Sequence, residues 1–113
     1  MKMIEAYVRP EKLQPVKEAL EKLGIKGMTI SQVKGHGAQG GIKLAGRAGS
    51  YSVEFIDKVK FEICVDENAD IEGIISNIAD AARTGKPGDG KIFILPIEDA
   101  VRIRTMERGE SVC

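Results

Sequence analysis

The stretch KVKFEICV, residues 58–65, decides the fold class of this chain, because its side chains alternate strictly in character. In an extended chain, successive side chains point to opposite faces. One face then carries the apolar residues Val59, Phe61, Ile63 and Val65, and the other carries Lys58, Lys60, Glu62 and Cys64. The pattern predicts a strand with one face in a hydrophobic core.

The residues that follow predict a helix, a glycine loop and two more extended pieces. A helix over about 70–84 carries one apolar stripe and ends at Gly85; the stripe consists of Ile71, Ile74, Ile75, Ile78, Ala79 and Ala82. Residues 92–97 (IFILPI) are apolar on both faces, which predicts a strand whose second face is buried by other subunits. Residues 100–105 (AVRIRT) predict a short strand with Arg102 and Arg104 on one side.

The residues before the central strand complete the order of elements. Residues 3–9 (MIEAYVR) and 28–34 (MTISQVK) predict strands. The helix between them starts at Pro15 and stops before Gly24. A long glycine-rich loop, residues 35–50, then leads to the central strand. The order strand, helix, strand, strand, helix, strand predicts a ferredoxin-like α+β sandwich in one domain over residues 1–113.

The overall composition limits the classes of partner. Lys and Arg total 17 and Asp and Glu total 17, which argues against a nucleic-acid coat or a polybasic membrane binder. No apolar stretch is long enough to span a bilayer, and no signal-peptide pattern stands at the N-terminus, so we predict a cytoplasmic protein. Cys64 and Cys113 lie far apart in sequence and predict neither a disulfide framework nor a metal site, and Cys64 is interpreted as a small buried apolar residue.

Two glycine motifs resemble nucleotide-binding fingerprints but stand in the wrong context. The loop TGKPGDGKIF, residues 84–93, has P-loop spacing, yet a strand follows it where a P-loop needs a helix. The GxGxxG match at 35–40 is likewise not followed by a helix. Glycine-rich backbone can still bind an anion, with Lys91, Arg102 and Arg104 as donors. From composition alone, a plain turn with solvated cations is equally compatible.

Several motifs together resemble the PII nitrogen-regulatory signalling proteins over nearly the whole chain. They are KGMT at 26–29, KGHGAQGG at 34–41, Tyr51, DKVK at 57–60, TGKPGDGKIF at 84–93 and RIRT at 102–105. The resemblance implies a homotrimeric, non-catalytic sensor that binds ATP or ADP between subunits and, with Mg²⁺-ATP, binds 2-oxoglutarate. It also implies regulation of an ammonium transporter or of nitrogen-assimilation enzymes such as glutamine synthetase.

The resemblance further assigns roles to single residues. Residues 84–91 correspond to the family's nucleotide loop (B-loop), and residues 102–113 to a C-terminal segment that reaches a neighbouring subunit. The nucleotide contacts implied are Thr29, Gly35, Gly37, Ala38, Gln39, Cys64, Gly88, Asp89, Gly90, Lys91, Arg102 and Arg104. Among them, Thr29 and the backbone of Cys64 would frame the adenine. Gln39 would ligate Mg²⁺ and contact 2-oxoglutarate, and Lys58 would pair with a 2-oxoglutarate carboxylate.

The long loop, residues 37–55, corresponds to the family's docking element, the T-loop. Tyr51 matches a residue that some members carry as a uridylylation site, and Arg47 is the candidate plug for a transporter pore. Ala38 replaces an arginine common in relatives, which leaves room for altered discrimination between ATP and ADP. Membrane contact is implied only through a transporter.

Three other functions compete with this interpretation. A small phosphate-handling enzyme lacks candidates, since the sequence shows no Ser-His or Cys-His pairing and no paired carboxylates at a site. A single-stranded RNA binder would need exposed sheet aromatics, whereas Phe61 and Phe93 lie in core-like runs. A PII-like adaptor that binds nucleotide but ignores 2-oxoglutarate stays open because of Ala38.

Overall fold

The computed structural model describes residues 1–36 and 55–113 and shows four strands and two α-helices in this part of the chain. In chain order they are β1 (Lys2–Val8), α1 (Leu13–Lys22), β2 (Thr29–Gly35), β3 (Ile56–Val65), α2 (Ile71–Ala82) and β4 (Gly90–Pro96). Short 3₁₀ turns, η1 (Pro10–Lys12) and η3 (Glu110–Val112), precede α1 and follow β4.

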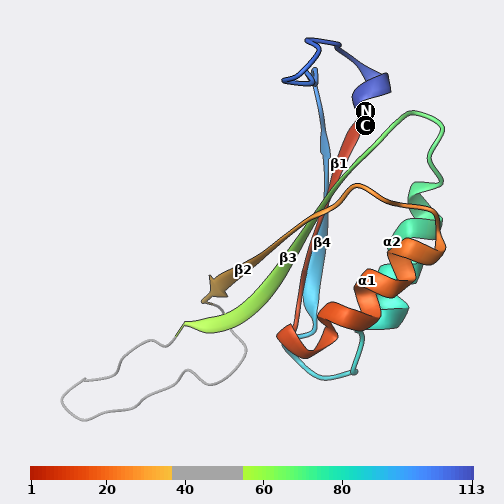
Figure 1. Cartoon of the computed structure of the whole chain (residues 1–113). Helices are drawn as coiled ribbons and strands as arrows, with labels where there is room; N and C mark the ends of the chain where they lie inside the picture. The colour runs from red at the N-terminus through yellow and green to blue at the C-terminus, as the bar shows by residue number, and fades with distance from the viewer. Residues whose placement is uncertain (37–54) are drawn as a thin grey trace.

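The strands form one antiparallel sheet in the order β2-β3-β1-β4. Both helices cover the same face of this sheet, so the molecule has two layers (Figure 1). In the register, Ile4 of β1 lies between Ile63 of β3 and Ile94 of β4. The predicted ferredoxin-like α+β sandwich is thereby confirmed.

The core lies between the sheet and the helices. The alternation that predicted the strand at 58–65 is visible in its burial, because every second residue of β3 from Val59 onward is buried. The sheet contributes Ile4, Ala6, Val8, Val59, Phe61, Ile63 and Val65, and the helices contribute Val16, Leu20, Ile74, Ile78 and Ala82. Burial of these side chains is the main force that holds the helices on the sheet.

The observed ends of the two helices agree with the sequence prediction at some positions and differ from it at others. Asp70 caps α2, because its side chain accepts a hydrogen bond of 3.1 Å from the backbone N–H of Gly73. Gly24 follows α1 with φ +85°, as predicted for a residue past the helix end. The predicted start at Pro15 is wrong, since α1 already begins at Leu13 after η1. The predicted end at Gly85 is also wrong, because Arg83 is already extended.

The predicted strand over residues 100–105 does not form. Only an isolated bridge joins Val101 to Arg108, and the chain reverses between them. The backbone N–H of Met106 donates to the carbonyl of Arg102 at 2.7 Å, and Met106 has φ +65°. Short-range bonds of this turn replace the ladder that the alternating sequence predicted.

The two cysteines form a disulfide, which corrects the interpretation of Cys64 as an unpaired buried residue. Cys64 and Cys113 are joined across 49 residues of sequence, with a Cα–Cα distance of 5.2 Å. Cys64 is half-buried on the face of β3 that points away from the core. The bond attaches the C-terminal segment to the sheet.

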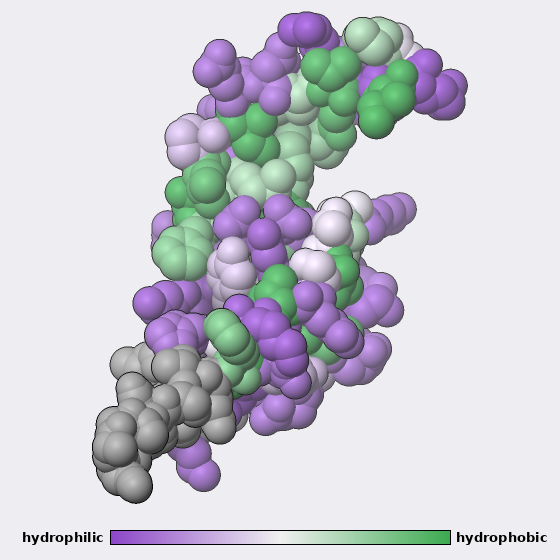
Figure 2. Space-filling model, turned by 90° about the vertical axis from the view of Figure 1, so that its left-hand side faces the viewer, coloured by the Kyte–Doolittle hydropathy of each residue, from purple (hydrophilic) through white to green (hydrophobic). Residues whose placement is uncertain are grey.

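Strand β4 exposes apolar side chains on both of its faces. It is an edge strand, paired only with β1 in the described sheet. Large exposed apolar residues of β4 and the following turn are Phe93, Ile94, Leu95, Val101, Ile103 and Met106. Figure 2 shows apolar surface continuing from the sheet up to the C-terminal segment at the top of the molecule. Patches of this kind are typical of an interface with another protein surface.

Within the described residues, no helix combines the length and the apolar character that a membrane span requires.

Candidate functional site

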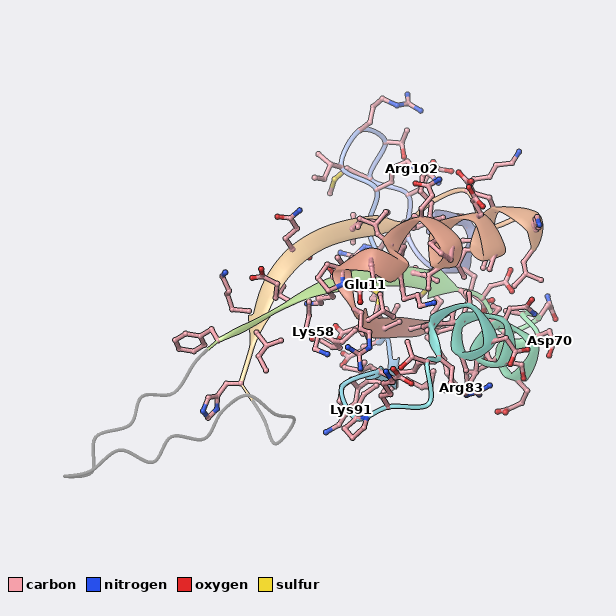
Figure 3. The ribbon with its side chains drawn as sticks, turned by 90° about the horizontal axis from the view of Figure 1, so that it is seen from below. Glu11, Lys58, Asp70, Arg83, Lys91 and Arg102 are labelled. Carbon is pink, nitrogen blue, oxygen red and sulfur yellow. A yellow bond between two sulfur atoms is a disulfide. The ribbon has the colours of Figure 1, made fainter. Side chains whose placement is uncertain are left out.

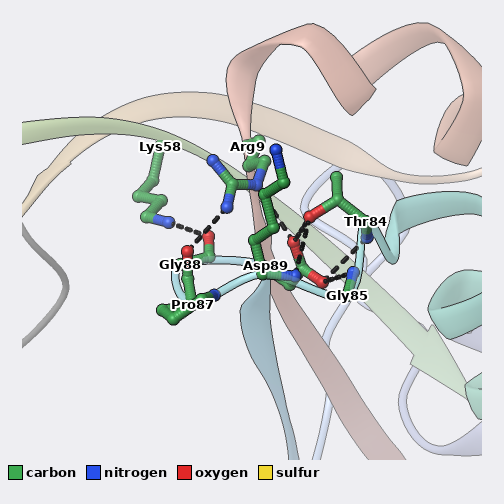
Figure 4. Close-up of polar contacts among 8 residues, drawn as sticks. Arg9, Lys58, Thr84, Gly85, Pro87, Gly88 and Asp89 are labelled. Carbon is green, nitrogen blue, oxygen red and sulfur yellow. Dashed lines mark hydrogen bonds and ion pairs between the residues drawn. The ribbon is translucent and has the colours of Figure 1, made fainter.

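The loop between α2 and β4, residues 84–91, is organised around the carboxylate of Asp89. One oxygen of this carboxylate accepts hydrogen bonds from the backbone N–H groups of Thr84 and Gly85, both at 2.8 Å. The other accepts from the Thr84 hydroxyl at 2.5 Å and from Arg9 Nε at 3.0 Å. Figure 4 shows these bonds converging on one side chain. The carboxylate therefore acts as the internal tether of the loop.

Arg9, at the end of β1, holds this loop at a second point. Its guanidinium also donates to the carbonyl of Pro87 at 2.7 Å. The two bonds join positions that are 78 and 80 residues apart in sequence. A glycine-rich loop that would otherwise sample many conformations is thus held in one.

The same contacts determine the charge of Asp89. The hydrogen bond from the Thr84 side chain, the backbone N–H groups of Thr84 and Gly85, and the bond from Arg9 hold the pKa of Asp89 well below its usual range. The group stays ionised at neutral pH, and its charge is balanced by Arg9. The bonds already formed leave the loop backbone, rather than this carboxylate, as the surface for an anionic ligand.

Gly90 can be only glycine for two reasons. Its φ is +116°, in a region that side chains disfavour. A Cβ at this position would also overlap the backbone carbonyl of Tyr7 on the neighbouring strand β1. The glycine therefore allows the loop to pass directly into the β1–β4 pairing.

Lys58 of β3 reaches the loop from the sheet. Its Nζ donates to the carbonyl of Gly88 at 2.5 Å. Partial burial, followed by the nearby charge of Arg9, lowers the pKa of Lys58. A negative charge beside this ammonium would stabilise its charged form, so the position can accept a carboxylate or phosphate ligand.

A cavity of about 450 Å³ brings many of the predicted site residues together. Its polar rim is formed by residues that the sequence predicted to bind nucleotide or 2-oxoglutarate: Gly35, Lys58, Gly88, Gly90 and Lys91. Tyr7 and Phe93 form an aromatic wall, with ring centroids 5.9 Å apart in an edge-to-face arrangement. His36 at the end of β2 also lines it. The cavity joins cationic and glycine-rich groups to an aromatic surface, a combination suited to a nucleotide.

Thr29 and Cys64 lie elsewhere, beside a second cavity of about 930 Å³. Strand β2 pairs with β3 only as far as Glu62, opposite Thr29. After Glu62, the edge of β3 that faces β2 is therefore not paired with any described strand. The predicted contact between the Cys64 backbone and an adenine ring stays a prediction.

Arg102 and Arg104 lie away from the loop that they are predicted to complete. Arg102 donates to Glu107 at 2.5 Å and to the Ser111 carbonyl at 3.0 Å. The hydrogen bond from the Thr105 hydroxyl, followed by the one from Arg102, lowers the pKa of Glu107. Figure 1 places the C-terminal segment and the loop at opposite ends of the sheet, and Figure 3 shows Arg102 far from Lys58 and Lys91. Arg104 is exposed and forms no ion pair with another described residue.

Five predicted residues lie outside the described ranges. They are Gly37, Ala38, Gln39, Arg47 and Tyr51, and with them almost all of the predicted docking loop, residues 37–55. Their assigned roles stay predictions.

Sequence reasoning missed several residues that the structure brings to this site. Arg9 holds the loop through Asp89, and Tyr7 and Phe93 form the aromatic wall. Thr84 lies inside the predicted loop, but its bond to Asp89 was not predicted. The period of β1 and β4 could have placed Tyr7 and Phe93 on the face away from the core. No local pattern could have paired Arg9 with Asp89, because their contact depends on the sheet register.

Comparison with known proteins identifies the family. The family model described as "Nitrogen regulatory protein P-II" matches residues 1–107. The chain belongs to the P-II family. The nitrogen regulatory protein P-II of Nostoc punctiforme is 51% identical to this chain, and that of Azospirillum brasilense is 49% identical. Each alignment covers 96% of this chain and 96% of the relative. The crystal structure of Arabidopsis thaliana PII bound to citrate matches with a TM-score of 0.76 at 44% identity, covering 97% of this chain and 89% of that one.

Membership of the P-II family also establishes the general class of function. PII proteins carry the name of nitrogen regulators, so this chain is a regulatory signal-transduction protein and not an enzyme, as predicted. The fold of the described residues is that of a PII protein.

Proposed function

We propose that this PII protein senses nitrogen and carbon status by binding ATP or ADP and, together with Mg²⁺-ATP, 2-oxoglutarate. The observation that carries the proposal is the cavity beside β3, where Lys58, Gly88, Gly90 and Lys91 meet an aromatic wall. Loop backbone and Lys91 would bind the phosphates, and the aromatic wall would contact the nucleoside.

Lys58 is the proposed partner of a carboxylate. Its Nζ now donates to the Gly88 carbonyl, a neutral acceptor that an anionic ligand could replace. A related PII is known bound to citrate, a carboxylate ligand, which supports a carboxylate site in this family. Gln39 would supply the side-chain ligand of Mg²⁺, whose remaining positions phosphate and effector oxygens would fill.

A homotrimer would complete the site. Along β3, Cys64 lies six residues from Lys58, about 20 Å at the usual rise of a strand. The loop lies at the Lys58 end, whereas Thr29, Cys64 and the C-terminal arginines lie toward the other end. We propose that a neighbouring subunit supplies Arg102 and Arg104, together with Thr29 and the Cys64 backbone. The exposed apolar residues of β4 support such an assembly.

The regulatory output would pass through residues 37–55. Ligands at the base of this docking loop would change its conformation, and coupling free energies of about 1–3 kcal/mol are sufficient for regulation. Arg47 would contact an ammonium transporter, with glutamine synthetase as the other kind of target and Tyr51 as a modification site. Cytoplasmic location, absence of nucleic-acid binding, and a single PII domain over residues 1–113 remain part of this proposal.

A calorimetric titration of ATP tests the nucleotide site. Lys91→Ala should weaken ATP binding at least about tenfold, because it removes a charge-assisted donor from the loop. Lys17→Ala is the matched control, since the i,i+4 ion pair of Lys17 with Glu21 on α1 is exposed. Equal affinities in the two variants would contradict the placement of the phosphates.

The nucleotide-only adaptor is the second candidate function. It would share the ATP result but would not bind 2-oxoglutarate under any condition, so the effector titration separates the two.

A further inference from the structure

The disulfide between Cys64 and Cys113 lies on an accessible surface of the protein. Cys113 is exposed and Cys64 is half-buried, on the sheet face away from the core. The Cα–Cα distance of 5.2 Å is within the usual range for a disulfide. Both residues line the 930 Å³ cavity that also contains Thr29. External thiols therefore have access to this bond.

Besides the backbone that continues from β4, the disulfide attaches the C-terminal segment covalently to the sheet. Residues 99–113 form many hydrogen bonds among themselves, including Arg108 to Asp99 at 2.7 Å. Among described residues, only one hydrogen bond links them to the rest of the protein, from the Glu67 backbone N–H to Glu110 Oε1 at 3.1 Å. That bond is exposed, so the half-buried side chain of Val112 is the main other contact near Cys113 if the disulfide opens.

A short series of contacts connects the disulfide to Arg102. The guanidinium donates to the carbonyl of Ser111, two residues before Cys113, and its other contact is Glu107 in the same segment. The position of Arg102 relative to the sheet is thus set by a segment that the disulfide anchors. Cys64 itself is the residue whose backbone is proposed to contact the adenine.

We propose that Cys64 and Cys113 form a reversible thiol–disulfide switch that fixes the C-terminal segment and thereby controls nucleotide affinity. The control of nucleotide affinity rests on the proposed function, whereas the anchoring of the C-terminal segment by the disulfide does not. In the oxidised form Arg102 is held in place before the ligand arrives, so binding costs less conformational entropy. Reduction frees the segment and weakens nucleotide binding. In the predicted cytoplasmic location disulfides are usually transient and redox-sensing, which agrees with such a switch.

The chemistry is exchange with a low-molecular-weight thiol. Its thiolate attacks Cys113 Sγ, the bond to Cys64 Sγ breaks, and Cys64 leaves as a thiolate that takes up a proton. A second thiolate then attacks the external sulfur of the mixed disulfide and releases Cys113, which is protonated in turn. Two electrons pass from two external thiols to the protein, and the external couple leaves as its disulfide. Reoxidation reverses both steps.

The test compares oxidised protein, protein reduced with dithiothreitol, and the Cys113→Ser variant, which keeps the Cys64 backbone unchanged. Titration with a thiol reagent should count no free thiols in the first and two in the second. Calorimetry should show ATP binding about tenfold weaker in the reduced protein. Cys113→Ser should match the reduced protein and show no response to dithiothreitol. Equal affinity in the oxidised and reduced forms, or tighter binding after reduction, would overturn the control of affinity.

Hydrogen exchange gives a second measurement that needs no ligand. The amides of Met106, Gly109 and Val112, each bonded within residues 99–113, should exchange faster after reduction, whereas those of β1 should not change. Unchanged exchange at these amides would overturn the switch, even if ATP binds. Faster exchange in a protein that binds no ATP in either state would support the anchoring and overturn the proposed function.

Discussion

Arg9 Nε lies 3.0 Å from Asp89 Oδ1, and this ion pair joins the end of β1 to the loop before β4 across 80 residues of sequence. Both side chains are largely shielded from solvent, with 24% of each exposed. The same guanidinium binds the Pro87 carbonyl, so one residue holds the loop on two sides of Gly88. The preformed shape of the loop depends on this contact, since glycines alone would leave it flexible.

Replacing Arg9 should therefore weaken nucleotide binding without a direct contact to the ligand. Arg9→Gln should lower ATP affinity about tenfold, because the binding free energy must then order the loop. Arg83→Gln is the matched control, as its ion pair with Asp80 is exposed at the end of α2. Calorimetry on both variants tests the idea, and equal affinities would show that the loop is held by other contacts.

The acid stability of the protein should depend on Asp89. The folded state lowers the pKa of Asp89, so the stabilisation is fully present above the unfolded pKa of about 4 and disappears as pH falls toward the folded value. Asp89→Asn should be less stable than the parent at pH 7. It should also lose less stability between about pH 5 and pH 2.

Urea denaturation at a series of pH values, at fixed protein concentration, measures this difference. Asp80→Asn serves as the control because the ion pair of Asp80 with Arg83 is exposed. If Asp89→Asn loses as much stability on acidification as the parent, the stabilising role of this carboxylate is wrong.

A series of glycine variants separates backbone strain from steric overlap. Gly27→Ala should change the free energy of unfolding by less than about 0.5 kcal/mol, since the position is open. Gly24→Ala should cost about 1–2 kcal/mol, because φ is +85° but no atom is near. Gly90→Ala should cost at least about 1 kcal/mol more than Gly24→Ala, because its Cβ would also overlap Tyr7. Equal costs at Gly24 and Gly90 would refute the close approach of the strands.

The exposed apolar residues of β4 should hold the proposed trimer together. Leu95→Asp should convert the protein to monomers, because a charge would be buried in the interface. Leu23→Asp is the control at the end of α1, where the leucine is exposed to a similar degree, 43% against 39% for Leu95. Light scattering after gel filtration measures the mass. A Leu95→Asp protein that stays trimeric would place the interface elsewhere.

Much of the fold could be predicted because its signals are local. The alternation around Phe61 gave the central strand, and the apolar stripe of α2 gave the helix above it. The element order then allowed few topologies. Lys58, Gly88, Gly90 and Lys91 were likewise predicted as site residues from motifs, and the structure places them around one cavity.

The remaining features depend on contacts between distant parts of the chain. The Cys64–Cys113 disulfide spans 49 residues, and spacing alone gives no reason to pair them. The alternation at Arg102 and Arg104 resembled a strand, but side-chain and backbone bonds to Glu107 favour a turn. Helix α1 starts earlier than Pro15 predicted because proline is tolerated throughout the first turn, where its missing N–H has no partner to lose.

Calorimetric titration of 2-oxoglutarate, with and without Mg²⁺-ATP, tests whether this protein senses carbon status. We expect binding only when Mg²⁺-ATP is present. We also expect this binding to be lost in Gln39→Ala and Lys58→Ala, and Lys17→Ala to behave as the parent. Absence of 2-oxoglutarate binding in every condition, while ATP itself binds, would show that the protein is a nucleotide-binding adaptor and not a sensor of 2-oxoglutarate.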